Sequence, residues 1–83
     1  MVTTESIAAS IRAGLACDHV EVGGDGHHFE ALIVAAAFDG ASRVRRHQLV
    51  YATLGDRMRE EIHALSMTTL TPAEWTRRQQ GAQ

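Results

Sequence analysis

The side chains that could do chemistry in this chain are five histidines, one cysteine and a cluster of arginines. Imidazole nitrogens are common metal ligands, whereas an all-cysteine zinc or iron–sulfur site needs four thiolates. The single cysteine, Cys17, therefore excludes an internal disulfide and any all-cysteine site built by this chain alone. We expect Cys17 to be a small buried hydrophobe rather than a reactive thiol.

Taken on the residues alone, most of the histidines have ordinary roles. For His63, an unliganded imidazole bonded to a carbonyl group is favoured over a metal ligand. His27 and His28 are typical of exposed loop residues. His47 falls among apolar residues of a predicted helix, which favours a partly buried structural histidine. His19 is predicted to face solvent from a strand.

The arginines Arg43, Arg45 and Arg46 occupy the first turn of a predicted helix, where the macrodipole disfavours cations. A solvated helix face explains them, and so do contacts with an outside carboxylate or with phosphates of DNA. DNA ranks third, because the chain has ten acidic residues against eight basic ones and a net charge of -2. A protein with that charge offers nucleic acid no general attraction.

The first half of the chain predicts a helix and a β-hairpin. Apolar residues spaced four apart, Ile7, Ile11 and Leu15, indicate an amphipathic helix that starts after Thr3 or Thr4 and continues to about Ala16. Alternation then favours a strand around residues 19–22, and the Gly-rich segment 23–26 predicts a turn. A second strand is expected from His28 or Phe29 to about Ala37, antiparallel to the first.

The second half predicts two helical segments, a strand and a last helix. The central helix covers Ser42–Leu54, with a stripe made of Val44, His47, Val50, Tyr51 and Leu54, and Gly55 ends or kinks it. A short helical turn follows at 56–61 and a third strand at 62–70. Thr71, Pro72 and Glu74 form a capping-box pattern for a helix that carries Trp75 as its core anchor.

These elements predict one α+β domain in the order α-β-β-α-α-β-α, with helices on one face of a three-stranded sheet. The chain of 83 residues is long enough for one core. We assign residues 1–76 to the domain and 77–83 to a flexible polar tail. No segment has the length of a membrane span or the pattern of a signal peptide, so we expect a soluble cytoplasmic protein with no membrane partner.

Distinctive segments occur in order along the chain: 24–29 at the hairpin, 38–40, 42–44 and 46–51 around the central helix, 62–65 on the third strand, and 71–75 at the last cap. In these segments the chain resembles the BolA family, within its IbaG-like branch, over about residues 5–76. The resemblance implies a fold like a class II KH domain.

The family resemblance also implies a non-enzymatic role. Members pair with monothiol glutaredoxins around a shared [2Fe-2S] cluster in iron–sulfur trafficking or in iron and stress sensing, with glutathione supplied on the partner side. By resemblance His63 is the principal cluster ligand and His28 the second, with His27 and His47 as alternates. The arginines Arg43, Arg45 and Arg46 would contact the glutaredoxin, its glutathione or DNA. A homodimer of the protein without its partner is left open.

The alternative function implied by the family is DNA binding in stress-responsive transcription regulation. Two departures weaken it: Gln48 replaces the last residue of an Arg-His-Arg triplet, and the Gly-x-x-Gly loop of true KH domains is missing between the helices. Catalysis has no support, because Ser42 and His47 point about 140° apart on a helix. We therefore predict an adaptor or regulator rather than an enzyme.

Overall fold

The computed structural model describes residues 2–62 and 64–81. Its helices and strands follow the predicted order, with one added 3-10 turn. They are α1 (Thr4–Gly14), β1 (His19–Gly24), β2 (His28–Val34), the 3-10 turn η1 (Ala36–Phe38), α2 (Arg43–Leu54), α3 (Arg57–Glu60), β3 (Ala64–Leu70) and α4 (Pro72–Gly81). The α+β class is confirmed.

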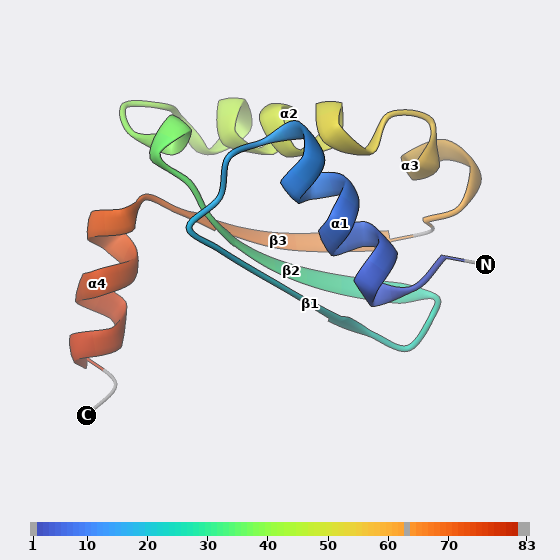
Figure 1. Cartoon of the computed structure of the whole chain (residues 1–83), viewed down its shortest axis with the longest axis horizontal. Coiled ribbons are helices and arrows are strands. Elements are labelled where there is room, and N and C mark those ends of the chain that lie inside the picture. Colours follow the sequence, from blue (N-terminus) through green and yellow to red (C-terminus); the bar gives the residue numbers. More distant parts are fainter. Residues whose placement is uncertain (1, 63, 82–83) are drawn as a thin grey trace.

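The three strands form a sheet in the order β1-β2-β3, so β2 is central. β1 and β2 are antiparallel, as a hairpin requires, whereas β3 is parallel to β2. A parallel pair needs a crossover, and α2 and α3 supply it. Figure 1 shows the result: the hairpin, α3 and the start of β3 lie at one end of the molecule, and α4 lies at the other.

The core lies between the sheet and the helices α1 and α2. Ile7 and Ile11 of α1, Phe29 and Ile33 of β2, and Val50 of α2 are all almost fully buried. Alternation along the strands sends Val20 of β1 and Phe29 of β2 into this core, and turns their neighbours in sequence to the opposite face. The helix spacing predicted for α1 is confirmed by its two buried isoleucines.

The predicted stripe on α2 is only partly right. Val50 and Leu54 are buried, but Val44 is 67% exposed and Tyr51 is 40% exposed, so Tyr51 is not the core residue expected. The buried side of α2 passes instead through Arg46, Val50 and Leu54, spaced four apart. An arginine begins that series. A stripe chosen by hydropathy alone therefore leaves out Arg46 and takes in Val44 and Tyr51 instead.

The largest differences in segment ends from the prediction are at β2 and α4. β2 stops at Val34 rather than near Ala37, because residues 36–38 turn into a 3-10 helix that buries Phe38. α4 continues to Gly81, so residues 77–81 are helical where a flexible tail was expected. The Thr71 cap is confirmed: Glu74 N donates to Thr71 Oγ1 at 3.1 Å, and Thr71 N donates to Glu74 Oε1 at 2.8 Å.

The last helix does not join α1 and α2 on their face of the sheet. Trp75 stacks on His19 of β1 with ring centroids 4.9 Å apart. Because Val20 points into the core, His19 belongs to the opposite face, and α4 covers that face at one end. Trp75 is thus a half-exposed stacking partner rather than the predicted core anchor, and His19 is half-buried rather than solvent-facing.

Candidate functional site

The candidate ligand His28 is the first residue of β2. Figure 1 shows that the hairpin turn and the start of β3 lie at the same end of the sheet. We call this region, Gly24–His28 with Ala64, the hairpin end. His28 is exposed and is paired in register with Ala64 of β3. Ala64 directly follows His63 in the sequence, and His63 itself lies outside the described residues. The parallel pairing therefore brings His28 beside the strand entry that the sequence assigns to the principal ligand.

The turn that carries His28 is held by one carboxylate. Oδ1 of Asp25 accepts hydrogen bonds from the backbone N–H groups of His27 and His28, each at 2.9 Å. These bonds, from His28 first and then from His27, lower the pKa of Asp25 below its usual value. The carboxylate is therefore charged at neutral pH, and it fixes the backbone of the turn while the imidazole of His28 stays exposed.

A glycine makes this turn possible. Gly24 has φ of +153°, and a Cβ atom there would lie 2.4 Å from the carbonyl oxygen of His28. No side chain fits in that position. Gly24 is thus required by close approach of the backbone.

The two alternate ligands differ in their surroundings. His27 is exposed in the same turn as His28, whereas His47 is half-buried on α2, in keeping with the partly buried role predicted for it. Within residues 2–62 and 64–81, no three side chains of the types histidine, cysteine, aspartate and glutamate converge on a possible metal position. The described part of the chain therefore offers fewer than three converging ligands at any position.

Cys17 lies just before β1, at the far end of that strand from the hairpin. It is half-buried and packs against the core, as expected of a small hydrophobe. Burial raises the pKa of its thiol; nearby Arg12 opposes this shift and Asp18 adds to it. A thiol with a raised pKa is a poor ligand and nucleophile at neutral pH, so Cys17 does not complete the site at the hairpin end.

The three arginines of the first turn of α2 do not form one surface. Arg43 and Arg45 are exposed, but the side chain of Arg46 is only 15% exposed. Its guanidinium donates to the carbonyl oxygens of Ala41 and Thr69, each at 3.0 Å, and to Glu74 Oε1 at 2.8 Å. We call Arg46, Thr69, Thr71 and Glu74 the Arg46 cluster.

The Arg46 cluster assigns Arg46 a structural role that sequence reasoning missed. Its guanidinium joins the start of α2 to the end of β3 and to the cap of α4, and it lies 6.0 Å from the ring centroid of buried Phe38. The bonds from Thr71 first, and from Arg46 second, lower the pKa of Glu74. One signal was available: Arg46 stands four residues before buried Val50 on the same helix face.

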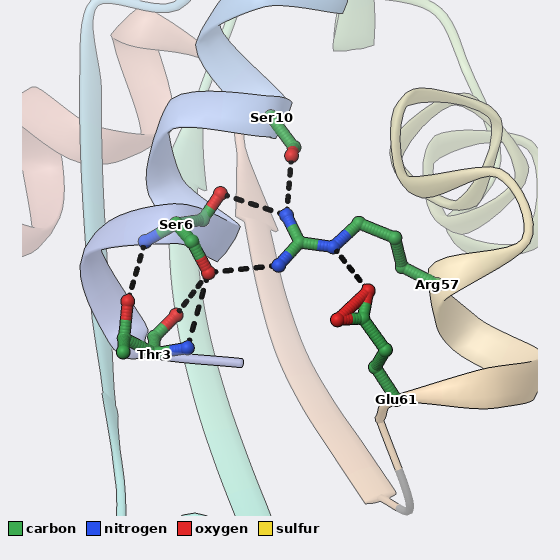
Figure 2. A network of polar contacts seen from close by, with 5 residues as sticks. All are labelled: Thr3, Ser6, Ser10, Arg57 and Glu61. Atoms are coloured by element: carbon green, nitrogen blue, oxygen red, sulfur yellow. Dashed lines mark hydrogen bonds and ion pairs between the residues drawn. The ribbon is translucent and has the colours of Figure 1, made fainter. Parts of the chain in front are cut away.

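A second arginine was also missed. Figure 2 shows Arg57 of α3 reaching across to Ser6 and Ser10 of α1 while it pairs with Glu61. The pair with Glu61 has the i,i+4 spacing that a helix pattern can indicate, but the bonds to α1 join residues about fifty positions apart in the chain, which no local pattern reveals.

Comparison with known proteins agrees with this fold and these segments. The family model described as "BolA-like protein" matches residues 2–74. The protein called acid stress protein IbaG, from Escherichia coli K12, is 42% identical over 72 residues, which cover 86% of each chain. The solved structure of a BolA homologue from Coxiella burnetii superposes with a TM-score of 0.83 at 47% identity, covering 92% of this chain and 99% of that one.

A third relative carries a different name. The Haemophilus influenzae protein called DNA-binding transcriptional regulator BolA is 40% identical over 52 residues, which cover 63% of this chain and 50% of that protein.

The fold and its solved structural neighbours define a small α+β domain with a three-stranded sheet. The chain belongs to the BolA family, and its similarity to IbaG over most of its length places it in the IbaG-like branch. Within the part that the structure describes, no helix is both long and apolar enough to cross a membrane.

Proposed function

We propose that this protein is an adaptor that pairs with a monothiol glutaredoxin and shares a [2Fe-2S] cluster with it, in iron–sulfur trafficking or iron and stress sensing in the cytoplasm. The observation that carries the proposal is the position of His28: its imidazole is exposed on a turn whose backbone is fixed, opposite Ala64, the neighbour of His63. His63 and His28 are the proposed ligands from this chain.

The donor set fits a shared cluster better than a cluster held by this chain alone. A [2Fe-2S] cluster takes four ligands, and histidines can replace two cysteines on one iron. This chain has one cysteine, which is half-buried away from the hairpin end. Thiolates from the partner and its glutathione would then complete the set. The bound cluster would supply electron-transfer or iron–sulfur transfer chemistry.

The residues of the hairpin end prepare His28 for that role. The Asp25 carboxylate accepts the backbone N–H of His28, so the turn needs no hydrogen bond from the imidazole ring to hold its shape. A ring nitrogen must be unprotonated to bind a metal. The fixed turn lowers the entropy that a partner must spend to order the ligand.

Co-expression with the host's monothiol glutaredoxin and anaerobic purification test the proposal. We expect a coloured heterodimer whose visible circular dichroism differs from that of the glutaredoxin homodimer. His63→Ala should abolish the shared cluster without unfolding the protein, and His28→Ala should weaken it. His27→Ala is the matched control, since it removes an imidazole from the same turn. Separate elution with the glutaredoxin's own spectrum would refute the pairing.

The same set of variants also tests the ligand assignment within a confirmed pair. If His27→Ala weakens the cluster and His28→Ala does not, the second ligand is His27. If His63→Ala leaves the spectrum unchanged, the principal ligand has been assigned wrongly even though the pairing stands. Zinc content, measured by elemental analysis, separates iron–sulfur binding from metal picked up in purification.

DNA binding is the second candidate function, and it is favoured by the name of the Haemophilus influenzae relative together with the two exposed arginines Arg43 and Arg45. Arg46 contributes little to such a surface, because its guanidinium is bonded internally. A titration of duplex DNA near physiological salt tests it. Binding that disappears there, or that Arg43→Ala with Arg45→Ala does not change, would remove this candidate.

A further inference from the structure

The short helix α3 cannot keep its place by itself. It has four residues, Arg57–Glu60, and none of them is buried. A single helical turn is not stable in water, because nucleation costs more than one hydrogen bond returns. Tertiary contacts must therefore hold α3, and Arg57 makes most of the polar ones.

All three guanidinium nitrogens of Arg57 are engaged (Figure 2). Nη1 donates to the carbonyl oxygen of Ser6 at 3.1 Å and to Ser10 Oγ at 2.7 Å, and Nη2 donates to Ser6 Oγ at 2.8 Å. Nε donates to Glu61 Oε1 at 3.0 Å. The side chain is 24% exposed, so these bonds are partly shielded from water.

The α1 side of this network is itself fixed. The Ser6 hydroxyl donates to the carbonyl oxygen of Thr3 at 2.9 Å and accepts the Thr3 N–H at 3.0 Å, while Ser6 N donates to Thr3 Oγ1. This is the capping box that starts α1, and α1 packs on the core through Ile7 and Ile11. Arg57 therefore anchors α3 to a rigid element.

The other side of the network leads to the hairpin end. The carbonyl oxygen of Arg57 accepts the backbone N–H of Ile62 at 2.9 Å, and Ile62 is buried in the core. Ile62 is the last described residue before His63, and Ala64 after it pairs with His28. Arg57 thus contacts α1 through its side chain. Its carbonyl oxygen bonds to the segment that leads into β3.

We propose that Arg57 is a positioning residue for His28, because it holds the link from α3 to β3, and Ala64 at the start of β3 is paired in register with His28. This inference rests on the proposed function. Arginine suits the task because its planar guanidinium reaches acceptors in several directions at once, which a lysine ammonium on the same backbone cannot reproduce.

Four variants test this inference in two measurements: Arg57→Gln, Arg57→Lys, Ser10→Ala, and Arg59→Gln as the matched control, an exposed arginine of the same helix. The first measurement is amide hydrogen exchange of the protein without its partner. We expect faster exchange at residues 58–62 and 64–66 in Arg57→Gln and no change in Arg59→Gln. Ser10→Ala removes one acceptor only, so it tests the network with less risk to folding.

The second measurement is the rate at which a chelator removes the cluster from the complex with the glutaredoxin, followed by visible circular dichroism. Loss of a residue that orients a metal ligand costs about 10- to 100-fold, and we expect an increase in rate of that size for Arg57→Gln. Arg57→Lys should restore part of it, and Ser10→Ala should show a smaller change in the same direction.

The outcomes separate the inference from the proposed function. A wild-type protein that forms no shared cluster overturns both. A wild-type cluster that Arg57→Gln and Ser10→Ala both release at the unchanged rate overturns the inference alone. Faster amide exchange without faster cluster release would assign Arg57 to stability and not to positioning.

Discussion

The polar side chains at the two ends of the sheet have different hydrogen-bond partners. At the Arg46 cluster, the guanidinium, the Glu74 carboxylate and the Thr71 hydroxyl are bonded to one another and to the backbone. At the hairpin end, the Asp25 carboxylate accepts hydrogen bonds from the backbone N–H groups of His27 and His28. His28 is exposed there.

Residue type alone therefore does not identify a site. Arg46 looks like a binding residue in the sequence, with two other arginines beside it. In the structure its guanidinium joins α2 to β3 and α4 by hydrogen bonds. His28 looks like an ordinary loop residue, yet its backbone N–H donates a hydrogen bond to the Asp25 carboxylate. A rigid backbone with an exposed side chain is the arrangement that ligand binding favours.

The largest effect should come from the backbone of the hairpin end. Gly24→Ala would place a Cβ atom 2.4 Å from the His28 carbonyl oxygen at a positive φ, so we expect a loss of about 3 kcal/mol in the free energy of unfolding. Urea unfolding measures it. Gly23→Ala is the control, since its Cβ atom would meet nothing within 4 Å. Equal losses in both variants would contradict a rigid hairpin end.

The next largest effect should come from the Arg46 cluster. Arg46→Met keeps much of the apolar stem but removes the bonds to Ala41, Thr69 and Glu74, and we expect a loss of about 2–3 kcal/mol. Arg43→Met, at an exposed position of the same turn, should stay within about 0.5 kcal/mol. If the two variants have the same unfolding midpoint in urea, Arg46 is not structural.

A smaller effect is expected at the cap of α4. Thr71→Ala removes the hydroxyl that accepts Glu74 N, which costs about 1 kcal/mol. The fluorescence of Trp75, which is the only tryptophan of the chain, reports on this helix. We expect its emission to change at a lower urea concentration than in the wild type. An unchanged midpoint would show that the stack on His19 is enough to hold α4.

The smallest and most local effect is the acid titration of Asp25. Its pKa is lowered in the folded protein, so its contribution is present above the unfolded pKa of about 3.9 and is lost as the pH falls through the folded value. We expect the amide signals of His27 and His28 in NMR spectra to shift together, with a midpoint below 3.9. Asp25→Asn should abolish this titration step. A midpoint at or above the usual value would contradict the two hydrogen bonds.

Most of the fold could be predicted because its signals are local. Thr71, Pro72 and Glu74 specify a helix start within four residues, and Gly55 ends α2 with a φ of +56°. The hairpin follows from the glycines and Asp25. Ile62, by contrast, was placed in the third strand and lies in the core before it, because a buried aliphatic satisfies both descriptions.

The family segments indicated His28 and His63 as ligands, and this assignment stays a prediction. The structure adds that His28 is paired in register with Ala64, which no sequence pattern indicated. The helix pattern did not reveal that Arg57 reaches α1, or that Trp75 stacks on His19. The exposure of Val44 and Tyr51 was missed for the same reason, since the face of α2 that is buried depends on what packs against it.

The sequence by itself determined the order of the elements, their caps and turns, and the family to which the chain belongs. These depend on residues within a few positions of one another or on matching segments in order. The tertiary structure decided which arginines are structural, which aromatic residues are buried, and where α4 lies. Arg46 finds its partners 23 and 28 positions away and Arg57 finds its partners 47 and 51 positions away, and only folding brings such distant residues within hydrogen-bond range.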